Sequence, residues 1–87
     1  MKIQTDTKLI DLSGKVLDGV TVGSVISNCL AGQKSDNPAM SYQLAKKFSL
    51  ENVVDLKIEE LAFVKKKLTE STYTDLVVGQ IIELLES

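Results

Sequence analysis

The chain has 87 residues, of which 44% are hydrophobic and 25% are charged, and its ten basic and twelve acidic residues give a net charge of −2. This length allows one domain with a modest core, and this composition excludes a disordered chain. Every basic residue is lysine, so the protein has no arginine with which to bind guanine in two places, and the acidic balance also argues against nucleic acid as a partner.

The N-terminal part of the chain predicts a β-hairpin over about residues 2–18. The stretch "KLIDLSGKVL" contains two short extended runs around Ser13-Gly14, and glycine supplies the positive φ that a tight turn requires. Asp18-Gly19 predicts a second turn. A short, exposed hairpin also offers an edge to which a partner strand can add.

Two amphipathic helices are expected next, over about residues 22–31 and 38–49. Thr21 is a good cap for the first helix, and Pro38 suits the first turn of the second one, where its missing N–H costs nothing. One face of each helix is apolar: Val22, Val25, Ile26, Cys29 and Leu30 in the first, and Met40, Leu44, Ala45 and Phe48 in the second.

A short apolar run at Val53-Val54 precedes a third helix, expected over about residues 58–69. Its apolar stripe consists of Ile58, Leu61, Ala62, Val64 and Leu68. Lys65 falls inside this stripe and can extend its stem toward water. Phe63 falls outside it, which leaves two interpretations: burial under the hairpin, which is favoured, or a role as an interface anchor.

The last helix, over about residues 75–86, has an unusually wide apolar face. Its members are Val77, Val78, Ile81, Ile82, Leu84 and Leu85, which span an arc of about 160°, wider than the roughly 100° of an ordinary surface helix. We therefore expect this helix to contact more than one neighbour, with one border of its apolar face available to bind another protein chain. The candidate interface residues are Phe63, Leu76, Val78, Ile82 and Leu85.

Together these elements predict an α+β fold in which an N-terminal β-hairpin packs on a small bundle of three to four helices, as a single domain over residues 1–87. No apolar run is long enough to span a bilayer, so no membrane partner is expected. The single Cys29 cannot form an internal disulfide, which favours a reducing, cytoplasmic location.

The sequence offers no catalytic, cofactor-binding or metal-binding residues, and no small-molecule substrate is evident. Cys29 lies on an apolar helix face, and the chain has no histidine to activate it. Glu59 and Glu60 diverge on their helix, and no acidic, histidine or cysteine cluster has the spacing of metal ligands. We expect a protein that is not an enzyme.

The alternative is a small DNA-binding regulator. The segment "YQLAKKFSLENVVDL" resembles the first half of a helix-turn-helix, in which Ala45 would pack beneath the turn. Ser49 stands where that motif usually has glycine, and the would-be recognition segment presents Glu51 and Asp55 to the phosphate backbone. Two lysine runs, Lys46-Lys47 and residues 65–67, remain as a candidate phosphate patch.

The strings "DLSGKVL" and "VVDLKIEELAFVKKKLTESTYTDLVVGQIIELLE" resemble a set of small phage and prophage proteins that open with a hairpin and end in a "VVGQ…LLE" helix. The resemblance implies a phage or prophage origin and no catalytic residue. With the wide C-terminal stripe, it predicts a self-associating accessory protein, either an assembly factor or a binder of a host protein. It would act in the host cytoplasm or in association with the virion.

Overall fold

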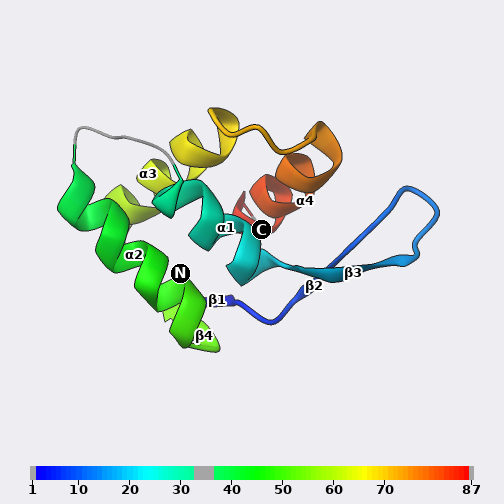
Figure 1. The fold of residues 1–87 in the computed structure, drawn as a ribbon, viewed down its shortest axis with the longest axis horizontal. Coiled ribbons are helices and arrows are strands. Elements are labelled where there is room, and N and C mark those ends of the chain that lie inside the picture. Colours follow the sequence, from blue (N-terminus) through cyan, green and yellow to red (C-terminus); the bar gives the residue numbers. More distant parts are fainter. Residues whose placement is uncertain (1, 33–36, 87) are drawn as a thin grey trace.

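The computed structural model describes residues 2–32 and 37–86, which form four helices and two small antiparallel sheets (Figure 1). This arrangement confirms the expected α+β class. In chain order the elements are β1 (Lys2–Gln4), β2 (Lys8–Ile10), β3 (Val16–Thr21), α1 (Val22–Ala31), α2 (Pro38–Leu50), β4 (Val53–Asp55), α3 (Ile58–Thr69) and α4 (Asp75–Glu86).

The four helices have the bounds that the sequence predicts, except that α2 ends one residue later, at Leu50. Local hydrogen bonds explain where they begin. The Thr21 hydroxyl accepts from the backbone N–H of Ser24 at 3.2 Å and caps α1. In α3 the cap comes from inside the helix, because Lys57 has no side-chain acceptor and the Glu60 carboxylate accepts from the Lys57 N–H at 2.9 Å.

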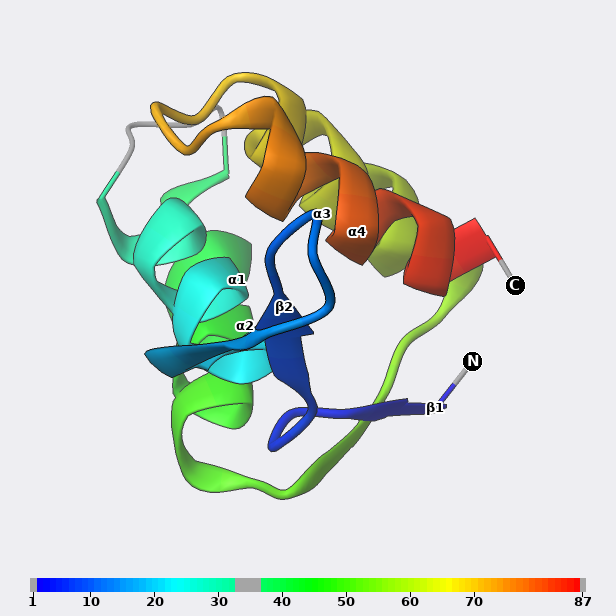
Figure 2. The same cartoon turned by 90° about the vertical axis from the view of Figure 1, so that its right-hand side faces the viewer.

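Helix α1 lies at the centre of the molecule, between α2 on one side and α3 and α4 on the other (Figures 1 and 2). Helix α1 packs on α2 and α3, α3 packs on α4, and the buried residues of all four helices form one core. The core consists of Ile3, Leu9, Val22, Val25, Ile26, Cys29, Leu30, Leu44, Ala45, Phe48, Val54, Leu56, Val64, Leu68, Ile81 and Leu85.

The N-terminal strand does not belong to the hairpin. Strand β1 pairs with β4, so that Ile3 lies opposite Val54, and both side chains are buried. The hairpin is therefore formed by β2 and β3, and the prediction that it starts near residue 2 is wrong. The apolar run at Val53-Val54 forms a strand because β1 brings it a pairing partner from the other end of the sequence.

A close approach at Gly23 joins the two halves of the chain. The Gly23 N–H donates to the Thr5 carbonyl at 2.9 Å, and the Thr5 hydroxyl donates to the Glu51 carbonyl at 2.6 Å. A Cβ at Gly23 would lie 2.7 Å from the Thr5 Cβ and 2.8 Å from the Phe48 carbonyl oxygen. Only glycine lets α1 begin this close to the β1–β2 connection.

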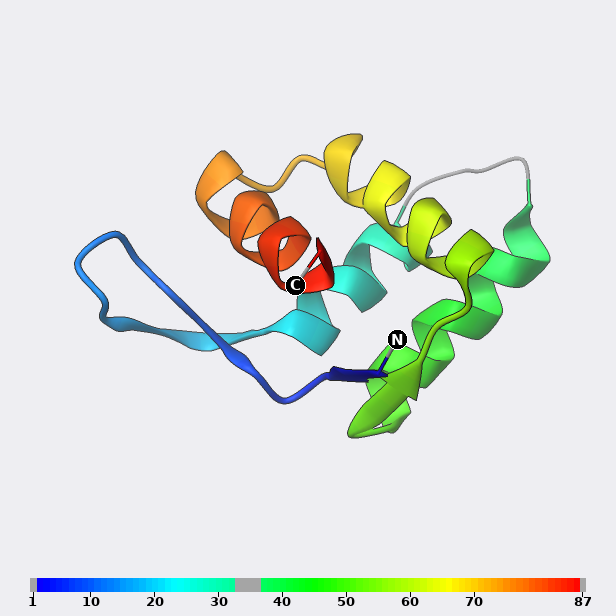
Figure 3. The same ribbon diagram turned by 180° about the vertical axis from the view of Figure 1, so that it is seen from behind.

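The β2–β3 hairpin extends away from the helices (Figures 1 and 3). Its pairing is irregular: Lys8 lies opposite Thr21 and Ile10 opposite Val16, so β3 has three more residues between these pairs than β2. Gly19 lies inside this bulge with φ +71°. The second turn predicted at Asp18-Gly19 is therefore wrong, because these residues belong to β3.

Helix α3 buries a different set of residues from the one expected. Ile58 is 86% exposed, whereas Lys67 is only 4% exposed. The Lys67 ammonium lies 5.9 Å from the centre of the Phe63 ring, and Phe63 is half-buried against the core. Only the side of α3 that carries Val64 and Leu68 faces α1 and α4, so Ile58 at the first turn has nothing to pack against.

Candidate protein-docking surface

A hydrogen-bonded turn fixes the end of the hairpin. The Asp11 carboxylate accepts from the Ser13 N–H at 2.9 Å, from the Ser13 hydroxyl at 2.6 Å and from the Lys15 N–H at 3.0 Å. Gly14, with φ +89°, closes the turn by donating to the Asp11 carbonyl. The turn is therefore a defined structure although it is exposed.

Aspartate is suited to this position because its charged form accepts all three hydrogen bonds. The bond from the Ser13 side chain, followed by the one from the Lys15 backbone, holds the pKa of the Asp11 carboxyl below its usual value of 3.8. Asp11 is consequently a carboxylate at neutral pH.

This turn presents an apolar surface to solvent. Leu12 is 94% exposed, and the cross-strand pair Ile10 and Val16 is also exposed on the outer side of the hairpin. On the inner side, Leu9 is buried, and Leu17 packs against the core. We call residues 10–16 the hairpin tip. It combines a fixed backbone with exposed aliphatic side chains, which is unusual for a solvated turn.

The hairpin edges are poorly suited to strand addition. On β2, the Ile10 N–H and carbonyl are both hydrogen-bonded to the Gln80 side-chain amide from α4. On β3, the bulge around Gly19 disrupts the straight edge that an added strand needs. Contacts through side chains at the hairpin tip are therefore favoured over the strand addition that the sequence predicts.

The interface residues expected on the last two helices are more covered than predicted. Leu85 is only 2% exposed, so the prediction that it contacts a partner is wrong. Phe63, Leu76, Val78 and Ile82 are half-buried, and each keeps part of its surface in solvent. Contacts within a single copy account for the wide apolar stripe of α4. This helix packs on α3 and on the core, and its Gln80 side chain is hydrogen-bonded to the hairpin.

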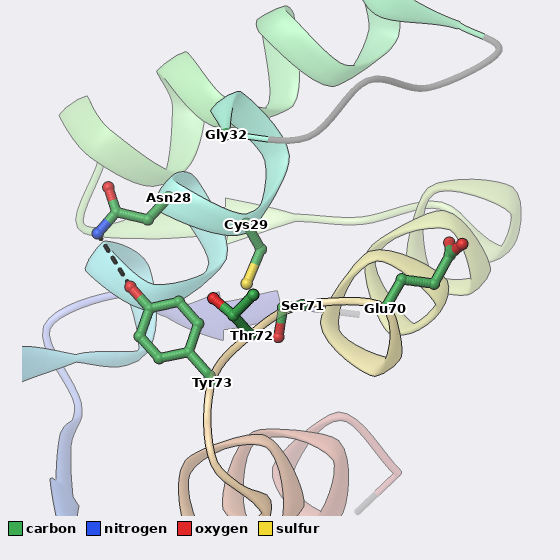
Figure 4. Close-up of a pocket in the computed structure, with 7 residues that line it drawn as sticks. All are labelled: Asn28, Cys29, Gly32, Glu70, Ser71, Thr72 and Tyr73. Carbon is green, nitrogen blue, oxygen red and sulfur yellow. Dashed lines mark hydrogen bonds between the residues drawn. The ribbon is translucent and has the colours of Figure 1, made fainter.

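A separate hollow of about 350 Å³ lies beside Cys29 (Figure 4). Its rim is polar, and the Asn28 amide donates to the Tyr73 hydroxyl at 3.1 Å across one side. Burial raises the pKa of the Cys29 thiol, and an interaction with the Ser71 side chain lowers it by less. A thiol that stays protonated, in a chain without histidine, is a poor nucleophile.

Two other kinds of feature are absent from residues 2–32 and 37–86, namely a metal-binding cluster and a membrane-spanning helix. These residues contain no group of three or more acidic, histidine or cysteine side chains that could hold a metal ion. Their helices are also too short or too polar to cross a membrane.

The helix-turn-helix geometry is not formed. After α2, residues Val53–Asp55 form strand β4 instead of a recognition helix, because they pair with β1. The second lysine run also does not present all its charges to solvent, since Lys67 is buried while Lys66 is exposed. The segment that motivated the DNA-binding alternative therefore lacks the structure which that alternative requires.

The hairpin tip is the part of the surface that sequence reasoning missed. Leu12 interrupts an otherwise polar turn, "DLSGK", and this apolar residue beside a Ser-Gly turn was the available signal. The exposure of Ile10 and Val16 depends on how the hairpin leaves the helices, which no local pattern reports.

The fold and surface define a small α+β protein with an exposed aliphatic hairpin tip. No protein-family model matches the chain, and neither the curated proteins nor the solved structures contain a match.

Proposed function

We propose that this chain is a non-enzymatic accessory protein that acts by binding another protein through its hairpin tip. The main support for this proposal is that Leu12 is 94% exposed on a turn whose backbone is hydrogen-bonded to Asp11. A fixed loop loses little conformational entropy on binding, so exposed apolar area on it contributes more fully to affinity.

The shape of the tip favours a partner that is a different protein. The tip is convex, so its partner must offer an apolar hollow. The hollow beside Cys29 and the one between the Thr5 region and α1 are both lined mostly by polar residues. A second copy therefore offers poor complementarity in these places, and an aliphatic pocket on a host or virion protein fits better.

A phage or prophage origin belongs to this proposal and is supported by the sequence resemblance alone. In such a setting a small protein of this kind would bind a host protein or assist assembly. The protonated, buried Cys29 and the lack of histidine support a role that does not involve catalysis.

The test is a comparison of the wild-type chain with Leu12→Ser. Partners from a bacterial lysate are captured on both, and each enriched protein is purified and titrated calorimetrically against both chains. We expect Leu12→Ser to weaken binding at least about 10-fold, since burying a leucine is worth roughly 1.5–3 kcal/mol. Ile58→Ser, which removes another strongly exposed apolar side chain, from α3, is the matched control and should bind as the wild type does. Equal affinity of the wild type and Leu12→Ser would refute the proposal.

A further inference from the structure

Two helices carry exposed faces of opposite charge. The outer face of α4 consists of Asp75, Gly79, Glu83 and Glu86, and α4 contains no lysine. We call it the acidic face of α4. The outer face of α2 consists of Tyr42, Gln43, Lys46, Lys47 and Leu50, and α2 contains no acidic residue. We call it the basic face of α2.

These charges are largely uncompensated within one copy. Neither Asp75 nor Glu83 forms an ion pair with a described residue, and the same holds for Lys46 and Lys47. Glu86 forms a single long ion pair with Lys65, at 3.7 Å. Such pairs on the surface contribute little to the stability of one copy.

Gly79 is a second indication that the acidic face of α4 is a binding surface. Glycine in a helix interior costs about 1 kcal/mol relative to alanine. A Cβ at Gly79 would have nothing within 4 Å, so the fold of one copy does not require glycine there. A glycine on an exposed helix face lets another element approach the backbone closely. Leu76 and Ile82, both half-buried, lie on either side of this notch.

The basic face of α2 has the matching features. Tyr42 is 64% exposed and Leu50 is 78% exposed, so the face carries large side chains that can fill a notch. The Lys46 ammonium lies 5.2 Å from the centre of the Tyr42 ring, which holds the charge beside the aromatic surface. Glu51 follows the C-terminal end of the helix and lines a surface hollow together with Lys46 and Lys47, so one carboxylate lies at the edge of this face.

We propose that the acidic face of α4 binds the basic face of α2 in a second copy of this chain. Lysines 46 and 47 would lie opposite Glu83 and Asp75, and Tyr42 or Leu50 would pack at Gly79. The inference goes beyond the proposed function by naming a second copy as a further partner, and it uses a surface separate from the hairpin tip.

The positions of the two faces determine what kind of assembly forms. α2 and α4 lie on opposite sides of α1 (Figures 1 and 2). One contact therefore leaves an unused face at each end, and repeated contacts build an open chain or a ring. A contact between two helix faces is smaller than the roughly 800 Å² per partner of a standard interface, so the association is weak and depends on concentration.

Sedimentation velocity of the wild-type chain from about 10 µM to about 1 mM tests the association itself, a range suited to small interfaces. We expect the mean sedimentation coefficient to rise with concentration. It should fall back toward the monomer value in about 1 M NaCl, where the Debye length shrinks to roughly 3 Å. A wild-type chain that remains monomeric throughout overturns the inference and leaves the hairpin-tip proposal intact.

Two double variants test the location of the contact. Lys46→Gln with Lys47→Gln neutralises the basic face and keeps the acidic one, whereas Gly79→Gln with Glu83→Gln fills the notch of the acidic face, removes one of its charges and keeps the basic face. All four positions are exposed, so we expect both variants to melt within a few degrees of the wild type. Each variant alone should be monomeric, and an equimolar mixture should form a species of two copies and no larger one.

The result for the mixture is specific because only one pair of intact faces remains: the acidic face of α4 in one variant and the basic face of α2 in the other. Association of either variant alone at the wild-type level places the contact elsewhere and overturns the inference while self-association stands. Leu12→Ser should associate as the wild type does, and loss of association in that variant would assign the contact to the hairpin tip instead.

Discussion

The side-chain amide of Gln80 forms two hydrogen bonds with the backbone of Ile10, although the two residues are 70 positions apart in the sequence. Its oxygen accepts from the Ile10 N–H at 3.0 Å, and its nitrogen donates to the Ile10 carbonyl. A side chain of α4 thus takes the place of a neighbouring strand at the outer edge of β2. This contact ties the projecting hairpin to the helices.

Replacing Gln80 with alanine should loosen the hairpin without unfolding the helices. The two lost hydrogen bonds contribute about 1 kcal/mol each, so the Ile10 amide should exchange with solvent roughly 10-fold faster or more. Amide hydrogen exchange followed by NMR measures this. Glu83→Ala, an exposed change on the same helix, is the control and should leave Ile10 unaffected. Unchanged exchange in Gln80→Ala would contradict the role given to this contact.

Alanine should have opposite effects at two helical glycines. Gly23→Ala should destabilise the fold by about 1–3 kcal/mol, because the new Cβ meets backbone and Thr5 atoms that cannot move freely. Gly79→Ala should stabilise it by up to about 1 kcal/mol, because its site is open and alanine favours a helix. Urea unfolding of the two variants measures both changes, and equal effects would show that the Gly23 approach is less tight than described.

Two leucines of the hairpin should differ sharply in their contribution to stability. Leu9 is buried and Leu12 is almost fully exposed. Leu9→Ala should lower the free energy of unfolding by about 2–4 kcal/mol, and Leu12→Ala should change it by less than about 0.5 kcal/mol. Denaturant titrations of the pair provide the comparison. A large loss in Leu12→Ala would mean that the hairpin tip is packed in solution and is not available to a partner.

The turn at Asp11 should respond to acid. Its folded pKa is lowered, so the stabilisation is fully present above the usual value of 3.8 and is lost as the pH falls through the folded value. An NMR titration should therefore show the Ser13 and Lys15 amide signals constant from pH 7 to about 4 and moving only below that. Asp11→Asn keeps an acceptor and removes the titration, so its amide signals should not move in this range. A midpoint above 3.8 in the wild type would contradict the assignment.

Cys29 should react slowly with thiol reagents in the folded protein. Burial raises the pKa of its thiol and also blocks access, so little reactive thiolate is present near neutral pH. Labelling with an aromatic disulfide reagent should be at least about 100-fold slower in buffer than in denaturant, because it requires opening of the core. Comparable rates in both conditions would indicate that the hollow beside Cys29 exposes the sulfur.

Residues that act through near neighbours were predictable. The bounds of α1 follow from the Thr21 cap and from apolar residues at helical spacing, and the same reasoning located α2, α3 and α4. The Ser13-Gly14 turn was equally visible because a positive φ at Gly14 is a local requirement. In each case the deciding interactions span only a few residues.

Contacts between distant parts of the chain were not predictable in this way. Strand β1 was placed in the hairpin because nothing near it reveals that β4 is its partner. Ile58 looked buried, and Lys67 looked solvated, since helical periodicity gives an apolar side but not which part of it meets a neighbour.

The sequence by itself therefore determined the α+β class, the four helices and the position of the hairpin turn, because caps, periodicity and turn residues act over a few positions. Only the tertiary structure decided the β1–β4 pairing, the covering of α4 and the exposure of Leu12 on a fixed turn. Those features depend on which surfaces meet when the whole chain packs around α1, and that is a property of all the elements together.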